Sequence, residues 1–177
     1  MLVELAMLLV LAAEPKSPPA PVVTRVRPLS GPARFVVDEG LLRSPTIARL
    51  VAELHQYDVF VYIEMDEPAG ARGSTSIMGV APGWRFLRVR IFRNLDPRQQ
   101  IEVLGHELHH ALEIARAANV VDEKSFRALF GRIGYESGNG FETDAARRVE
   151  EDIRRELSRS GARPANQVPK RDEEVLL

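Results

Sequence analysis

Three of the four histidines lie within five positions, in the sequence GHELHH of residues 105–110. His106 and His110 are four positions apart, so on a helix their side chains lie one above the other on the same face. This pair can hold one Zn²⁺ ion, and Glu107 on the adjacent flank can take a proton from a water whose pKa the metal lowers. At this composition, H-E-x-x-H is expected by chance about 0.01 times. The motif therefore predicts a zinc site with Glu107 as the general base.

The residues around the motif predict the helix that this site needs. Asp96 can cap its N-terminus and Pro97 suits its first turn, so we expect a helix over residues 96–118. Its core-facing stripe consists of Ile101, Leu104, Leu108, Leu112 and Ala115. His106 and His110 lie on the other face. His109 lies about 60° from His106 around the helix. We therefore interpret it as a bystander, with substrate contact as the alternative.

A catalytic zinc usually has three protein ligands, so a third must come from elsewhere in the chain. Glu113 follows the first histidine by seven positions, or about 10.5 Å of helix, and we expect it to support the ligands from behind or to lie on the surface. In a last helix over residues 141–157, the apolar stripe begins at Ala146. Glu142 lies four positions earlier and so points toward the core, where a carboxylate is costly unless paired or metal-bound. Glu142 is the predicted ligand, with Glu136 and Asp144 as alternatives.

Composition narrows the remaining classes of function. The 177 residues suit one domain, and 45% hydrophobic with 28% charged residues is ordinary for a globular protein. The absence of cysteine excludes thiolate metal sites, cysteine nucleophiles and redox motifs. Lys and Arg number 24 and Asp and Glu 25, giving a formal net charge of −1, so we expect no nucleic-acid partner.

The ends of the chain differ in composition from its middle. The apolar run of residues 5–13 is too short to span a membrane but has the length of a signal-peptide core. Residues 1–13 are therefore predicted to be a signal peptide or N-terminal anchor, giving a periplasmic or extracellular protein. A cytoplasmic protein is the alternative, since no Lys or Arg precedes the run. Residues 14–32 contain six prolines and indicate a linker, and residues 158–177 indicate a mobile tail.

The globular domain is then expected at residues 33–157. Helices are predicted over residues 44–55, 96–118, 122–132 and 141–157, and strands over residues 58–65, 74–80 and 84–92. The glycine-rich residues 131–140 are expected to form a loop. This order predicts an α+β fold with a small mixed sheet packed on the helix that carries the motif.

The segment GHELHHALE of residues 105–113 resembles the active-site helix of zincin metallopeptidases. With a downstream Glu142, the chain resembles the gluzincin branch in a small, single-domain bacterial form. The resemblance implies a peptide-binding edge strand just upstream, at Trp84–Phe92. It also implies an oxyanion-stabilising side chain, for which Tyr135 is the candidate. Many gluzincins carry an Asp four residues after the Glu ligand, but this chain has Ala146. Either another carboxylate, Asp144 or Glu113, orients the ligand histidine, or the site is tuned differently.

We therefore expect a zinc-dependent peptidase that acts on a peptide or protein. A zincin-like metal-binding or interaction module without catalysis is the main alternative, and a surface histidine cluster without metal is another. The sequence names no particular substrate and no oligomeric state.

Overall fold

The computed structural model describes residues 24–67, 71–138 and 140–161. These residues form five helices, a four-stranded mixed sheet and a two-stranded hairpin, which confirms the predicted α+β class. The elements in chain order are β1 (Val26–Pro28), α1 (Gly31–Arg43), α2 (Pro45–Leu54), β2 (Val59–Asp66), β3 (Gly73–Ala81), β4 (Trp84–Phe92), α3 (Pro97–Arg116), α4 (Glu123–Ile133), β5 (Tyr135–Ser137), β6 (Gly140–Glu142) and α5 (Asp144–Gly161). The predicted signal peptide or anchor of residues 1–13 lies outside the described residues, as do residues 162–177 of the predicted tail.

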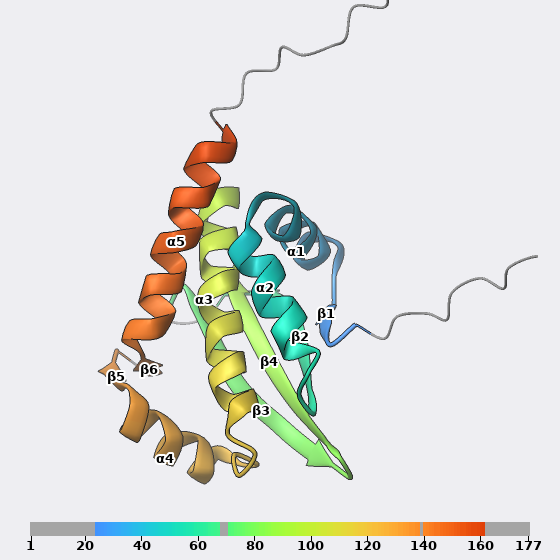
Figure 1. The fold of residues 1–177 in the computed structure, drawn as a ribbon, viewed down its shortest axis with the longest axis vertical. Coiled ribbons are helices and arrows are strands. Elements are labelled where there is room, and N and C mark those ends of the chain that lie inside the picture. The colour runs from blue at the N-terminus through green and yellow to red at the C-terminus, as the bar shows by residue number, and fades with distance from the viewer. Residues whose placement is uncertain (1–23, 68–70, 139, 162–177) are drawn as a thin grey trace, which may run out of the picture.

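The four-stranded sheet has the order β1-β2-β4-β3. The β1, β2 and β4 strands run parallel, whereas β3 pairs with β4 in the antiparallel sense. Helices cover one face of this sheet (Figure 1). The α3 helix lies against β3 and β4, α1 lies against β1 and β2, and α2 and α5 pack on α3. The α3 helix is therefore held between the sheet and the helices α1, α2 and α5.

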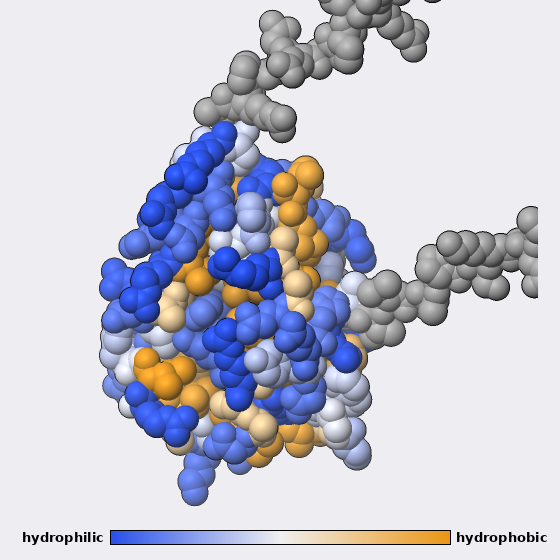
Figure 2. Space-filling model, viewed as in Figure 1, coloured by the Kyte–Doolittle hydropathy of each residue, from blue (hydrophilic) through white to orange (hydrophobic). Residues whose placement is uncertain are grey.

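The core lies between the sheet and this helical layer. Alternate residues of β2 and β4 point into it, in the order that a strand with one buried face requires. The largest fully buried side chains include Ile63 and Leu87 from the sheet and Leu104, Leu108 and Ile153 from the helices. The predicted core stripes of α3 and α5 are both buried. Figure 2 shows hydrophilic side chains along the outer face of α5.

The β4 strand lies inside the sheet, between β2 and β3. The prediction that Trp84–Phe92 is an edge strand is therefore wrong. The edge strand beside α3 is β3. Within β4, the side chain of Arg85 is only 3% exposed. It pairs with Asp58 and donates to the carbonyls of Ile114 and Ala117, at 2.9 and 2.8 Å. Arg85 thus caps the C-terminal end of α3.

The predicted linker at residues 14–32 extends too far, because its last part is folded. Val26 pairs with Val61 in the sheet and is buried. Ser30 caps α1 by accepting from the Ala33 N–H at 3.2 Å, and Pro32 lies in the first helical turn. Proline is favourable at that position, so it marks the start of a helix here and not a linker.

The segment before α5 also differs from expectation. Residues 131–140 were expected to be a loop, but Tyr135–Ser137 pairs with Gly140–Glu142 in an antiparallel hairpin. The last helix begins at Asp144, and not at residue 141, because the Thr143 hydroxyl accepts from the Ala146 N–H and caps it. Among the described residues, no helix is both long enough and apolar enough to cross a membrane.

Candidate metal centre

The motif residues lie on α3, whose ends are both fixed. Asp96 and Gln99 form a capping box at its start, and Arg85 caps its end. The helix passes α5 at Gly105, where a Cβ atom would collide with the side chain of Ile153. The missing side chain at Gly105 therefore lets α5 approach α3 one position before His106.

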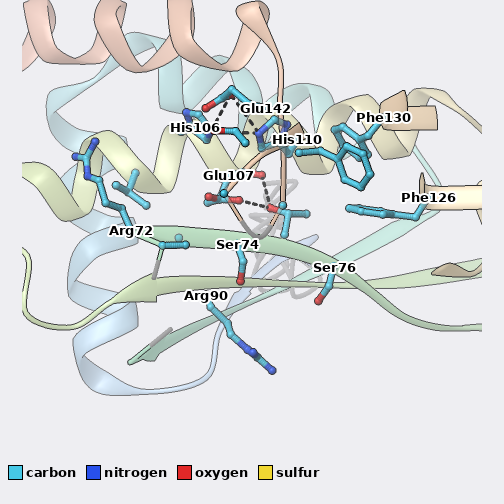
Figure 3. A pocket seen from close by; sticks show the side chains of 18 of the residues that line it. Arg72, Ser74, Ser76, Arg90, His106, Glu107, His110, Phe126, Phe130 and Glu142 are labelled. Carbon is cyan, nitrogen blue, oxygen red and sulfur yellow. Dashed lines mark hydrogen bonds and ion pairs between the residues drawn. The ribbon is translucent and has the colours of Figure 1, made fainter. Parts of the chain in front are cut away.

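His106, His110 and Glu142 come together as predicted and could hold one metal ion. The two histidine Nε2 atoms are 3.1 Å apart, and Glu142 Oε1 lies 3.4 Å from His106 Nε2 and 3.8 Å from His110 Nε2 (Figure 3). Ligand atoms about 2.0–2.1 Å from a tetrahedral ion are about 3.3 Å from one another. The three donors thus fit the size and the chemistry of a zinc ion.

Glu142 reaches the two histidines, but from a different element than predicted. Glu142 lies on β6, one residue before the cap of α5, and not within that helix. Its side chain is 20% exposed, so burial does not force it to find a partner. Of the two alternatives, Glu136 is exposed and Asp144 lies exposed in the first turn of α5, and neither joins the three-residue group.

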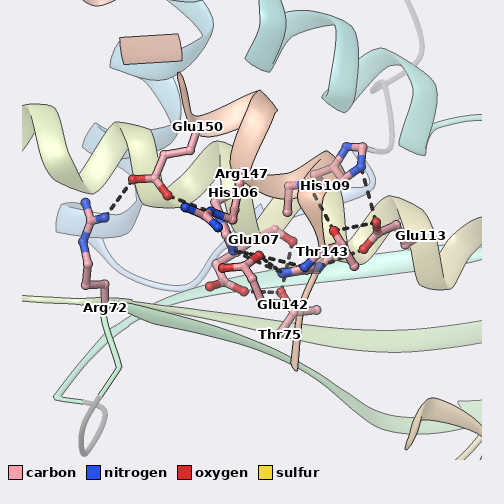
Figure 4. A network of polar contacts seen from close by, with 12 residues as sticks. Arg72, Thr75, His106, Glu107, His109, Glu113, Glu142, Thr143, Arg147 and Glu150 are labelled. Carbon is pink, nitrogen blue, oxygen red and sulfur yellow. Dashed lines mark hydrogen bonds and ion pairs between the residues drawn. The ribbon is translucent and has the colours of Figure 1, made fainter. Parts of the chain in front are cut away.

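Two further carboxylates fix the orientation of the histidine rings (Figure 4). His110 Nδ1 donates to Glu113 Oε2 at 2.8 Å, and His106 Nδ1 lies 3.2 Å from Glu150 Oε2. The hydrogen bond to Glu113 places the His110 proton on Nδ1 and leaves its Nε2 lone pair directed at the site. The Glu150 carboxylate lies close to His106 Nδ1 but does not form a hydrogen bond of good geometry with it. Glu113 therefore supports the ring of His110 from behind, which agrees with one of its two expected roles.

The charge of these carboxylates is stabilised by their partners. Burial raises the pKa of Glu113, but hydrogen bonds from His109 and His110 outweigh it and lower the pKa to about 2. The contacts of Glu150 with His106 and Arg72 likewise lower its pKa to about 2. Both groups are therefore anionic at neutral pH and complement a metal cation.

Glu107 lies beside the histidine pair in a different environment. Its side chain is buried, and burial raises its pKa, although the nearby histidines and the hydroxyl of Thr75 act in the opposite direction. The Thr75 hydroxyl lies 2.8 Å from Glu107 Oε2. A carboxylate with a raised pKa is suited to accept and release a proton near neutral pH.

His109 and Tyr135 lie apart from the predicted ligands. His109 Nε2 is 3.5 Å from Glu113 Oε1, so it helps to hold that carboxylate and is more than a bystander. The Tyr135 hydroxyl accepts a hydrogen bond from Arg147 at 3.2 Å, and the residue does not line the cavity at the site. The structure therefore does not bring Tyr135 to the position that its predicted role requires.

A cavity of about 810 Å³ opens beside the three predicted ligands. The β3 strand forms one wall of the cavity, Phe126 and Phe130 from α4 form another, and Phe141 of the hairpin adds to it (Figure 3). The Phe130 ring packs edge-on against the ring of His110, with centroids 5.3 Å apart. The site is thus a concave surface with polar groups on one side and aromatic rings on the other.

Two residues of the site were missed in the sequence, Glu150 and Thr75. A usable signal existed for Glu150, since it lies four positions after Ala146 and three before Ile153 and hence beside the buried stripe of α5. No comparable signal existed for Thr75, because its contact with Glu107 depends on which strand lies at the sheet edge.

Comparisons of this chain with protein-family models, with curated protein sequences and with solved structures find no match. What this site could do is therefore inferred from its geometry alone. Three side chains that could hold one metal ion lie beside the buried carboxylate of Glu107.

Proposed function

We propose that this protein is a zinc-dependent peptidase in which His106, His110 and Glu142 bind the metal and Glu107 is the general base. The observation that carries the proposal is the convergence of two Nε2 atoms and one carboxylate oxygen within 4.8 Å of one another, beside a buried carboxylate. The resemblance of residues 105–113 to the active-site helix of zincins agrees with this assignment.

The side chains have separate roles in the proposed reaction. Zinc, when bound, lowers the pKa of a water and polarises the carbonyl of the scissile bond. Glu107 accepts a proton from the attacking water and returns it to the nitrogen of the departing amine. Glu113 and Glu150 lie behind the two ligand histidines and orient their rings, so that each Nε2 faces the metal position.

The free edge of β3 is the proposed binding site for the substrate backbone. This strand borders the cavity, and no strand of the described residues pairs with its outer side. An extended peptide can add to such an edge through main-chain hydrogen bonds. The substrate is therefore proposed to be an unfolded or extended segment of a peptide or protein, bound at β3 instead of the strand that the sequence suggested.

A metal-binding module without catalysis is the second candidate. The orientation of Tyr135 toward Arg147 favours it, because the predicted oxyanion-stabilising hydroxyl does not reach the cavity. In that case the same residues would bind zinc, and Glu107 would have only a structural role.

Zinc analysis and peptide cleavage by one set of variants separate these candidates. We expect one zinc per chain, cleavage of a mixed peptide library by mass spectrometry, and loss of at least about 100-fold in rate for Glu107→Gln with zinc retained. Glu151→Gln, an exposed Glu→Gln change on α5, is the control and is expected to keep full activity. Zinc binding without cleavage of any peptide supports the module, and absence of zinc from the reconstituted protein refutes both.

A further inference from the structure

The edge strand β3 contacts the proposed general base directly. Thr75 Oγ1 donates to Glu107 Oε2 at 2.8 Å and lies 3.0 Å from the Glu107 carbonyl oxygen. Two positions earlier, a Cβ atom at Gly73 would lie 2.7 Å from Glu107 Oε1 and 2.6 Å from Val103 Cγ1. One oxygen of the carboxylate is therefore held by a hydroxyl, while the other occupies space that is open only because residue 73 is glycine.

The hydrogen-bonding pattern of the sheet shows where the main chain of these two residues points. The Phe92 N–H donates to the Arg72 carbonyl at 2.9 Å, so Arg72 and Phe92 form a hydrogen-bonded pair. Such pairs alternate along an antiparallel ladder, so Gly73 and Thr75 are not hydrogen-bonded to β4. Their N–H and C=O groups point to the other side, which is the free edge.

The pairing on the far side of β4 agrees with this assignment. The N–H groups of Arg85 and Arg93 donate to carbonyls of Asp58 and Asp66, so these residues of β4 bond toward β2. Val89 and Ile91, the partners of Thr75 and Gly73, are an even number of positions from Arg85 and also bond toward β2.

We propose that Thr75 is a positioning residue that fixes the carboxylate of Glu107, while the main chain of Gly73 and Thr75 aligns the substrate strand with that carboxylate. This inference rests on the proposed peptidase function and adds a defined link between substrate binding and the base. Gly73 and Thr75 would bind the substrate main chain and also contact Glu107. The three-residue segment 73–75 of β3 would therefore fix the distance between the scissile bond and the base.

The structure offers a matched control for the Thr75 contact. Thr46 is a buried threonine, whereas Thr75 is half-buried. The Thr46 hydroxyl donates to the Glu156 carboxylate at 2.8 Å, between α2 and α5 and outside the cavity lining. Thr46→Val and Thr75→Val each remove one Thr–Glu hydrogen bond of similar length. Only Thr75→Val removes a bond to the proposed base.

The kinetic test compares Thr75→Val, Thr75→Ser and Thr46→Val in the zinc-loaded protein on a library-selected peptide. A lost hydrogen bond to a charged group predicts that Thr75→Val lowers kcat by at least about 10-fold, with KM within about twofold and zinc content unchanged. Thr75→Ser keeps the hydroxyl and is expected within about threefold of the wild type, as is Thr46→Val. An unchanged kcat in Thr75→Val, or an equal loss in Thr46→Val, overturns the proposal.

A second readout does not depend on activity. In the metal-free protein, the urea midpoint is measured for Thr75→Val, Glu107→Ala and the double variant. The two substitutions are expected to be non-additive, because each removes the same hydrogen bond. Additive effects overturn the contact on which the proposal rests. An inactive wild type with non-additive effects instead refutes the peptidase function and, with it, the role of Thr75 in positioning a base.

Discussion

Replacement of Glu150 tests whether the carboxylates behind the histidines matter for metal binding. Glu150 Oε2 lies 3.2 Å from His106 Nδ1, and Glu150 Oε1 accepts from Arg72 at 2.7 Å and from Arg154 at 3.0 Å. The side chain is 14% exposed, so water screens these interactions only in part. Glu150→Gln preserves shape and one acceptor oxygen but removes the charge that stabilises the ring of His106.

The size of the effect follows from how much of the Glu150 carboxylate each substitution removes. Replacing the hydrogen-bond partner of a ligand histidine typically weakens metal binding about 10- to 100-fold, or about 1.4–2.7 kcal/mol. Because Gln keeps the size and polarity of the side chain and removes only its charge, we expect about 10-fold for Glu150→Gln and about 100-fold for Glu150→Ala. Zinc affinity is measured at pH 7 by competition with a chromophoric chelator. The control is Glu151→Gln, which changes an exposed neighbour on the same helix.

Two results would refute this reasoning. The first is an affinity of Glu150→Gln within twofold of the wild type, which would mean that the ring of His106 needs no carboxylate. The second is an equal loss in Glu151→Gln, which would assign the effect to the charge of α5 as a whole.

Four further outcomes are expected. Zinc at about 100 times its dissociation constant should stabilise the protein by about 2.7 kcal/mol and raise Tm by roughly 5–10 °C in calorimetry, and a chelator should reverse this. Gly105→Ala should lower the free energy of unfolding by about 1–3 kcal/mol in urea, because the new methyl group meets Ile153, and an unchanged midpoint would contradict the close packing of α3 and α5. Arg85→Met should cost about 2–4 kcal/mol by urea unfolding, because it leaves buried helix carbonyls without a donor. In the metal-free protein, the pKa of Glu150 is lowered from 4.5 to about 2, which adds stability above pH 4.5 that is lost as the pH falls toward 2. Glu150→Gln should therefore make the urea midpoint less dependent on pH across that range.

The parts of the fold that could be predicted from sequence are those with strong local signals. The α3 helix has a capping residue, a first-turn proline and an unbroken apolar stripe, and its predicted start agrees with the structure. The α2 helix and strands β2, β3 and β4 also lie within one or two residues of their predicted bounds. The positions of His106, Glu107 and His110 follow from helical spacing alone.

The parts that could not be predicted depend on contacts distant in sequence. Nothing local shows that β4 lies between β2 and β3, and the zincin resemblance implied an edge strand at this position. The contact of Arg85 with the end of α3 likewise depends on the tertiary fold. The α1 helix was missed because only Ala33, Val36, Val37 and Gly40 are buried along it, which is a weak pattern. Glu142 was identified by its distance from Ala146 in a helix that begins only after it, so the residue was right and the geometry wrong.

The placement of Glu142 on a hairpin has a consequence for how the chain would respond to a metal. Two ligands lie on α3 and the third on β6, so a bound ion would cross-link two segments and close the loop of chain between His110 and Glu142. That loop carries α4, whose buried side chains are Leu129 and Phe130. As with a disulfide, such a closure restricts the unfolded chain, by about 3–4 kcal/mol for a loop of this length. A bound zinc ion would thereby stabilise α4, which forms one wall of the cavity. After a chelator has removed the ion, proteases should cut within α4 and the hairpin far more readily.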